Sequence, residues 1–216
     1  NVLHGQWSSP AVAYVNGHPQ VLFGGGDGWL RAYDASSGRE LWRFDGNPPE
    51  AKWLPRPGVF SRSSIIATPV YGDGRVFIAM GQDPSHGDGP SVLHAVSPNG
   101  QGDITGSRGL WSYRGIGRVV GTPVLKDGLL YVGDLGGVVH CLDAATGRPY
   151  YEAERLGVGG DYYATGEKPR VGLAPIEELH DVRLVAPVAQ HIQAPLEACR
   201  IEQICAGMCH HEGFIS

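Results

Sequence analysis

The sequence predicts an all-β fold made of short antiparallel strands. Of its 216 residues, 33 are Gly and 16 are Pro, while only 18% are charged. This balance favours many short strands joined by tight turns over long surface helices. The hydrophobic content of 42% is enough to build a core in a chain of this length.

An internal repeat is the second observation behind this prediction. The stretches AYDASSGRELW (32–42) and CLDAATGRPYY (141–151) match at a constant offset of 109 residues. TPVYGDGRVFI (68–78) and TPVLKDGLLYV (122–132) match at an offset of 54. Because 54 is about half of 109, the pattern indicates a unit of roughly 50 residues that occurs three times.

Each unit has the pattern of four strands. Each unit begins with a strand led by Ser/Thr-Pro, a hairpin turn, an apolar strand and a Gly-rich turn. It continues with a third strand that ends in Asp, a turn, and a strand that carries an aromatic residue. Asp73-Gly74 and Asp127-Gly128 predict two-residue hairpins, since these turns need positive φ. The period of two places Trp42 and Phe44 on one face of a strand.

The predicted architecture is therefore a partial β-propeller of three four-stranded antiparallel blades. The predicted ranges are 8–45, 66–114 and 121–154 for the blades, 157–165 for the start of a fourth, and 1–165 for the propeller as a whole. Residues 166–216 are expected to form a mostly helical or irregular tail, with helices at 175–185 and 195–206. Three blades cannot close a ring, so the chain is a piece of a larger propeller, self-associates through open edges, or covers an edge with its tail.

The units resemble the quinoprotein-like (PQQ-like) β-propeller repeat family, whose motif ends in Asp-x-x-Thr-Gly-Lys-x-x-Trp. HGQWSSP (4–10), GGGDGWL (24–30) and GQDPSHG (81–87) look like uncharacterised bacterial PQQ-binding-like repeat proteins. The resemblance covers about residues 1–165. It implies a periplasmic or cell-envelope protein, but two kinds of function: PQQ-dependent dehydrogenases, and a non-catalytic lipoprotein of the outer-membrane β-barrel assembly machinery.

The shared motif has a structural interpretation. Its Asp accepts backbone N–H groups in a turn, its Gly supplies positive φ, and its aromatic residue packs against the neighbouring blade. Two insertions in the second unit, at 81–90 and 97–108, are expected to be surface loops of the kind that carry function. The predicted structural motif residues are Asp34, Gly38, Trp42, Trp111, Asp143, Gly147 and Tyr151.

Several site chemistries have weak sequence support. The net charge of −5 argues against a nucleic-acid partner, and no apolar run is long enough to span a bilayer. The Gly-rich stretches 24–28 and 115–121 continue as strands, whereas a phosphate loop opens a helix. Asp83, His86 and Asp88 do not have the spacing of a calcium loop, so an ordinary loop is favoured over a metal site.

The tail offers the remaining metal candidates. Cys205, Cys209 and His210 form Cys-x-x-x-Cys-His, which is one residue longer than a haem attachment motif. A zinc site could instead form from Cys199, Cys205, Cys209 and either His210 or His211, although the spacing lacks paired knuckles; an ordinary or poorly ordered tail with free thiols is the alternative.

The prediction for function is a non-catalytic interaction or scaffold module. It would be a fragment of a larger cell-envelope propeller that binds a protein or envelope component through its blade loops, without a cofactor. The alternative is a PQQ-dependent (quinoprotein) oxidoreductase or a fragment of one. The resemblance implies that such an enzyme holds PQQ and calcium in its central channel and uses an Asp base. Often a disulfide between adjacent Cys residues covers the ring. The sequence has no adjacent Cys pair, and no Asp matches a catalytic motif, so no catalytic or cofactor-binding residue is assigned.

Overall fold

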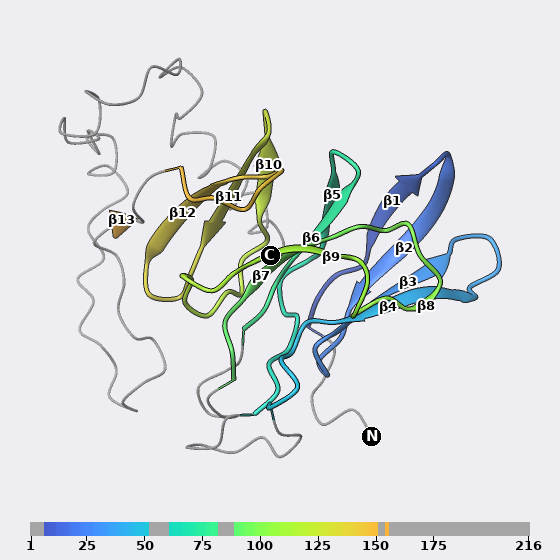
Figure 1. Ribbon diagram of the computed structural model, residues 1–216, viewed down its shortest axis with the longest axis horizontal. Helices are drawn as coiled ribbons and strands as arrows, with labels where there is room; N and C mark the ends of the chain where they lie inside the picture. Colours follow the sequence, from blue (N-terminus) through green and yellow to red (C-terminus); the bar gives the residue numbers. More distant parts are fainter. Residues whose placement is uncertain (1–6, 52–60, 82–88, 151–153, 156–216) are drawn as a thin grey trace, which may run out of the picture. The chain divides into compact units, whose positions relative to one another are not determined.

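The structure, a computed structural model, describes residues 7–51, 61–81, 89–150 and 154–155. Within these ranges it is all-β, with three sheets of mainly antiparallel strands (Figure 1). The predicted fourth-blade fragment, the predicted helices and the candidate metal ligands of the loop and tail lie outside the described residues. Among the described residues, no helix has the length and apolar character that crossing a membrane would require.

The three sheets are the three predicted blades. Within each blade, strands that follow one another along the chain pair antiparallel. Blade one contains β1 (Ala11–Val15), β2 (His18–Gly24), β3 (Trp29–Asp34) and β4 (Glu40–Asp45). Blade two contains β5 (Val70–Gly72), β6 (Arg75–Ala79), β7 (Leu93–Val96) and β9 (Gly109–Tyr113). Blade three contains β10 (Val124–Lys126), β11 (Leu129–Gly133), β12 (Val138–Asp143) and β13 (Glu154–Arg155).

The first hairpin of every blade has the turn that its sequence predicts. Asn16, Asp73 and Asp127 have φ of 51°, 50° and 50°, and each is followed by a Gly that also has positive φ. Two consecutive residues in this region make the turn whose twist matches that of the flanking strands. The Asp-Gly prediction is thus confirmed, and blade one forms the same turn with Asn16 and Gly17.

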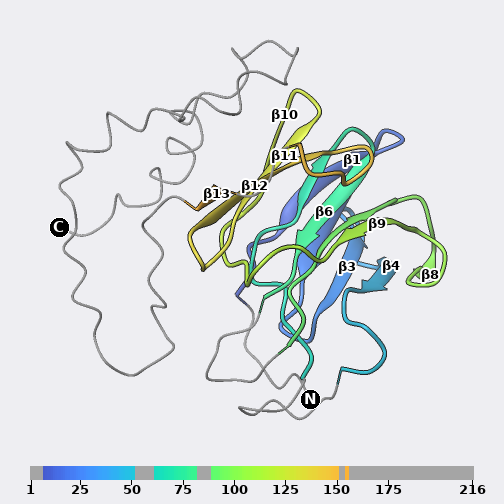
Figure 2. The same cartoon turned by 60° about the vertical axis from the view of Figure 1, so that its left-hand side comes forward.

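Blade one differs from the four-stranded prediction because it has a fifth strand. Strand β8 (Gly102–Asp103), from the second insertion of the blade-two segment, pairs parallel with β4 (Figure 2). Ile104 N–H donates to the carbonyl of Arg43 at 2.9 Å, and Asp45 N–H donates to Thr105 Oγ1 at 2.9 Å. An edge strand exposes unpaired backbone groups. The insertion predicted as a surface loop therefore covers the outer edge of blade one.

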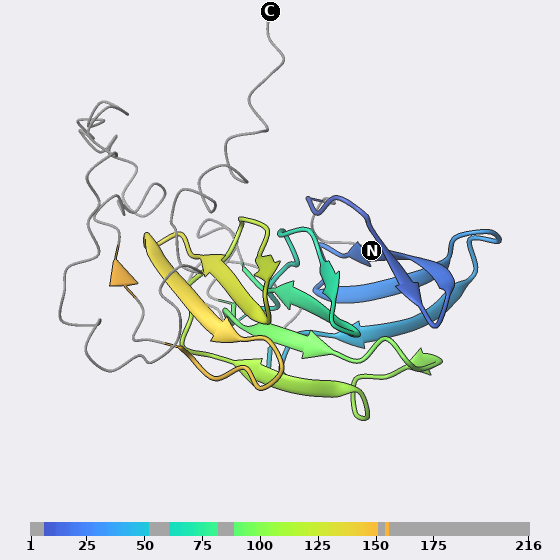
Figure 3. The ribbon, with the colours of Figure 1, turned by 90° about the horizontal axis from the view of Figure 1, so that it is seen from above.

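Blade two lies between the other two blades and shares a core with each (Figure 3). The first core joins Leu22, Leu30, Trp42 and Phe44 of blade one to Val76, Ile78 and Val96 of blade two. The second joins Phe77, Ala79, Leu93 and Ala95 of blade two to Leu130, Val132 and Leu142 of blade three. Alternate residues of β6 and β7 thus face opposite neighbours, as the period of two requires.

Candidate functional site

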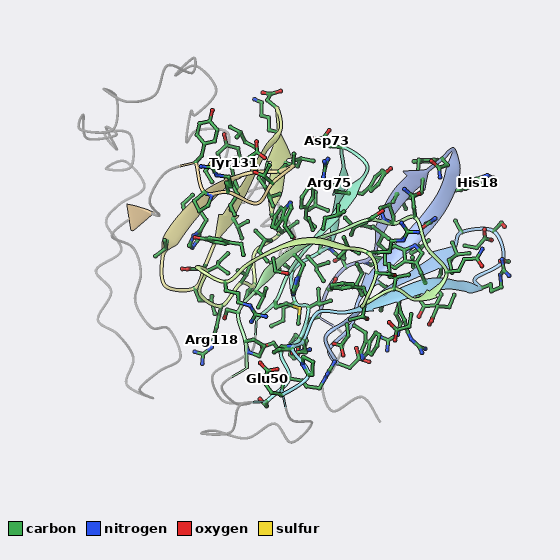
Figure 4. All side chains as sticks on the ribbon, in the orientation of Figure 1. His18, Glu50, Asp73, Arg75, Arg118 and Tyr131 are labelled. Atoms are coloured by element: carbon green, nitrogen blue, oxygen red, sulfur yellow. The ribbon has the colours of Figure 1, made fainter. Side chains whose placement is uncertain are left out.

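The candidate site is one rim of the blades, which we call the connection rim. It consists of the second turn of blades one and three, residues 25–28 and 134–137, together with the described parts of the segments that connect blades, 46–51, 61–69 and 114–123. Arg118 and Glu50, on these connections, lie at the opposite end of the strands from Asp73 and Arg75 of a hairpin turn (Figure 4). Loops on a rigid scaffold are where binding groups usually lie.

An ion pair organises the blade-one part of the rim. Asp27 accepts two hydrogen bonds from the guanidinium of Arg31, at 2.7 and 3.1 Å, and one from Trp29 N–H at 3.2 Å. Burial by itself would raise the pKa of Asp27, but the bonds from Arg31 and Trp29 outweigh it and hold the pKa below its usual value. Asp27 therefore stays ionised and is occupied as a hydrogen-bond acceptor.

The connection between blades one and two is bonded to the same turn. Arg62 pairs with the carboxylate of Asp45 and donates to the carbonyl of Asp27. Asn47 donates from its side chain to the carbonyl of Ser63 at 3.0 Å and accepts the Ser63 N–H at 2.7 Å. Asn47, Arg62 and Ser63 are buried, so the bonds fix the connection to blade one.

The blade-three part is organised by Asp134. Its carboxylate accepts from His140 Nε2 at 3.0 Å and from the N–H groups of Gly117, Gly136 and Val138 at 2.9, 2.9 and 3.1 Å. Burial would raise the pKa of Asp134, but the bonds from His140, Val138 and Gly117 hold it below its usual value. Because Gly117 belongs to the preceding connection, Asp134 ties that connection to the turn of blade three.

Two buried histidines complete contacts between blades. His94 Nε2 lies 2.9 Å from the carbonyl oxygen of Gly46, and its ring meets Phe44 of blade one edge-on at 5.5 Å. His140 meets Tyr113 of blade two edge-on at 5.8 Å. Burial lowers the pKa of His94 to about 4, although the bond to Gly46 opposes this. A ring that is buried and neutral at pH 7 fits a packing role.

The predicted turn residues lie on the rim opposite the connection rim. Asp34 Oδ1 accepts from Ser37 N–H at 2.8 Å, and Asp143 Oδ1 accepts from Thr146 N–H at 2.8 Å. Hydroxyl and backbone donors of Ser36 and Ser37 lower the pKa of Asp34 far below its usual range. Both carboxylates thus bond to their own turns, as the turn chemistry requires. Gly38 and Gly147 have φ of 69° and 72°.

The predicted aromatic residues lie between blades. Trp42 is completely buried and donates its indole N–H to Gln20 Oε1 at 2.9 Å. Trp111 of blade two lies over the turn of blade three and donates to the carbonyl of Ala144 at 3.1 Å. Tyr151, the corresponding residue of blade three, is outside the described residues.

The sequence did not predict the two side-chain pairs of the connection rim, Asp27–Arg31 and Asp134–His140. The offset of 109 residues relates Arg31 to His140, and each bonds to an Asp in the preceding turn. The match of Arg31 with His140 at the repeat offset could have indicated these pairs. Asp27 and Asp134, however, do not match each other at that offset, so neither pair is apparent from the repeat. Asp103 and Trp111 also repeat the spacing of Asp34 and Trp42, a third copy hidden by the surrounding insertion.

We tested whether the described residues suit PQQ and calcium, the group implied by the enzyme alternative. Calcium needs several oxygen ligands that converge on one point. The rim carboxylates of Asp27, Asp45 and Asp134 are already bonded to Arg31, Arg62 and His140. No three His, Cys, Asp or Glu side chains gather as metal ligands within the described ranges. The carboxylate oxygens of these residues therefore do not fit a PQQ–calcium site.

The comparisons with known proteins concern the fold. No protein-family model and no curated protein matches the chain. Solved structures similar to it include BamB from Moraxella catarrhalis, with 19% identity over 68% of this chain and 37% of that one and a TM-score of 0.44. The quinohemoprotein alcohol dehydrogenase from Comamonas testosteroni has 16% identity over 63% of this chain and 26% of that one, with a TM-score of 0.46.

A third similar structure is the quinohemoprotein alcohol dehydrogenase ADHIIG from Pseudomonas putida HK5. It has 20% identity over 68% of this chain and 27% of that one, with a TM-score of 0.42. The chain thus spans between 26% and 37% of the length of these three structures. Strand order and register show the β-propeller blades that the sequence predicts.

Proposed function

We propose that this chain is a non-catalytic interaction module of a β-propeller, and that its connection rim binds a protein. The observation that carries the proposal is the pair Val120 and Leu135, whose side chains are 43% and 38% exposed on two adjoining loops. Leu135 N–H donates to the carbonyl of Arg118 at 2.7 Å, which holds the two loops together. Apolar side chains on a fixed backbone bind with a small entropic cost.

The polar groups of the rim support binding rather than proton transfer. A general base works best when its pKa lies near the operating pH and its lone pairs can reach the substrate. Asp27 and Asp134 have lowered pKa values and are bonded to neighbouring donors. The proposal keeps the cell envelope as the compartment and a protein as the partner, both of which come from the sequence resemblance. It includes no cofactor.

A crosslinking experiment tests the binding surface. A photoreactive amino acid is placed at position 120 or 135 of the full chain, and the matched control carries it at Leu110, which is 49% exposed on β9 outside the rim. Each variant is irradiated in an envelope extract of the source organism. We expect a discrete crosslinked product from positions 120 and 135 that excess wild-type chain suppresses and excess Val120→Asp/Leu135→Asp chain does not. Equal products from all three positions, or none, would contradict the proposal.

A second experiment separates the module from the enzyme. The full chain is incubated with PQQ and calcium chloride, freed of unbound cofactor, and assayed for quinone absorbance and for dye-linked oxidation of alcohols. We expect neither retained absorbance nor turnover. Retained PQQ together with turnover would overturn the non-catalytic assignment.

A further inference from the structure

Each of the two interfaces between blades contains a buried histidine. His94 on β7 and His140 on β12 are 6% and 4% exposed. Phe44 of blade one meets the ring of His94 edge-on, and Tyr113 of blade two meets the ring of His140 in the same way. A buried imidazole takes up a second proton only where a neighbouring group compensates the charge. The response of each interface to acid therefore depends on the partners of its histidine.

His94 has only uncharged partners among the described residues. Its Nε2 lies 2.9 Å from the carbonyl oxygen of Gly46, which can only accept, so Nε2 carries the proton of the neutral ring. Its Nδ1 lies 2.8 Å from Ser112 Oγ and accepts the hydroxyl proton. The charged group that acts on the ring is Arg114, whose positive charge opposes protonation. A second proton on His94 thus places an uncompensated charge between blades one and two.

His140 has a carboxylate partner. Its Nε2 donates to Asp134 Oδ2 at 3.0 Å, and the two side chains are 4% and 5% exposed. Its Nδ1 lies 3.4 Å from Tyr113 Oη, an oxygen that can donate to the neutral ring or accept from the charged one. Despite burial, the hydrogen bonds to Asp134 hold the pKa of this carboxyl below its usual value. Protonation of His140 therefore produces an ion pair in place of an isolated buried charge.

We propose that the two interfaces form an acid-sensitive switch in which mild acid opens the contact between blades one and two and leaves the contact between blades two and three closed. His94 is the group whose protonation opens the first interface. Asp134 is the group that keeps the second interface closed, because it compensates the charge on His140. This response does not require the proposed binding function.

The switch acts on the connection rim unevenly. Gly46, the acceptor of His94, begins the rim segment 46–51. Asp134 instead receives the N–H of Gly117 and so holds the connection that precedes blade three. Acid therefore releases the part of the rim between blades one and two and leaves the part at blade three in place.

The size of the response follows from the two states of His94. Burial lowers its pKa to about 4 in the closed interface, although the bond to Gly46 opposes this, whereas a solvated ring titrates near 6.5. The closed form is therefore fully favoured above pH 6.5 and loses stability as the pH falls toward 4. Between pH 7.5 and pH 4.5 the ratio of open to closed forms should rise by about 10- to 100-fold.

Two protons report the two interfaces separately. Ile104 of the blade-two segment donates its N–H to the carbonyl of Arg43 of blade one at 2.9 Å. Trp111 of blade two donates its indole N–H to the carbonyl of Ala144 of blade three at 3.1 Å. Each bond breaks when its two blades separate, so hydrogen exchange at each proton measures the opening of one interface.

The experiment measures exchange of these two protons by NMR in the full chain at pH 7.5 and pH 4.5, corrected for the intrinsic exchange rate of each group. We expect acid to speed exchange at Ile104 by about 10- to 100-fold and to change exchange at Trp111 by less than about threefold. In His94→Gln the response at Ile104 should disappear, because glutamine can donate to Gly46 and does not titrate. Equal acceleration of both protons would mean one global opening and would overturn the proposal, as would a response at Ile104 that survives His94→Gln.

A second variant tests the role of the carboxylate. Asp134→Asn removes the charge that compensates His140, so acid should now speed exchange at Trp111 by about tenfold or more while Ile104 responds as in wild type. The two pH values are compared within each variant, which removes any constant loss of stability. An unchanged response at Trp111 would contradict the role of Asp134. If His94→Gln does not fold, the response at Ile104 in wild type is compared with the titration of the His94 ring resonances, and different midpoints would refute the switch.

Discussion

Replacing Gly147 with Ala should destabilise the chain more than the same change at Gly38. Both glycines have φ near 70°, where an L residue destabilises the folded chain by about 1–2 kcal/mol. Because alanine also restricts the unfolded chain more than glycine does, about 0.4–1 kcal/mol of this loss is offset in each case. We therefore expect Gly38→Ala to cost about 1 kcal/mol. At Gly147 the new methyl group would also lie 2.5 Å from Trp111 Cδ2 and 2.7 Å from its Cε3, and such overpacking adds about 1–3 kcal/mol.

The measurement is urea unfolding of the full chain, followed by tryptophan fluorescence, with stability compared at an unchanged m-value. The control is the same pair of changes in a Trp111→Ala background. There the cost of Gly147→Ala should fall to that of Gly38→Ala, because the clashing ring is gone. Equal costs in the wild-type background, or a difference that survives without the indole, would refute the assigned contact between blades two and three.

Three further outcomes follow from buried groups. Trp42→Ala should lower the free energy of unfolding by about 3–5 kcal/mol in urea, and a fully stable variant would refute its place in the core. Ile104→Ala should cost about 2–4 kcal/mol and speed amide exchange at Arg43–Asp45; slow exchange there would mean that β8 does not depend on Ile104. Because the pKa of His94 falls from 6.5 when unfolded to about 4 when folded, its contribution to stability is full above pH 6.5 and is lost as pH falls toward 4. Wild type should lose about 3 kcal/mol over that window and His94→Gln should not, as urea titrations at each pH will show.

Much of the fold could be predicted because its signals are local. Asp73-Gly74 and Asp127-Gly128 specify hairpins through backbone sterics that involve only the turn itself. The bonds that Asp34 accepts from Ser36 and Ser37 likewise join neighbours in sequence. The alternation that buries Trp42 and Phe44 follows from the pleat of a single strand.

Little of the candidate site could be predicted, because its contacts join distant residues. The bond from Gly117 to Asp134 and the contact of Arg62 with Asp27 cross from connections to turns. Their residue types, Gly, Asp and Arg, are common in any loop. Nothing in their spacing distinguishes them before the strands bring the loops together.

The sequence by itself determined the repeat, the turns and the alternating faces of the strands, because each depends on steric and hydrogen-bonding rules within a few residues. Only the tertiary structure decided what those faces meet. It showed that an insertion predicted as a loop extends blade one as β8, and that Trp111 covers Gly147 while no described side chain covers Gly38. Two turns with the same motif thus have different surroundings, since burial depends on which blade is packed beside each one.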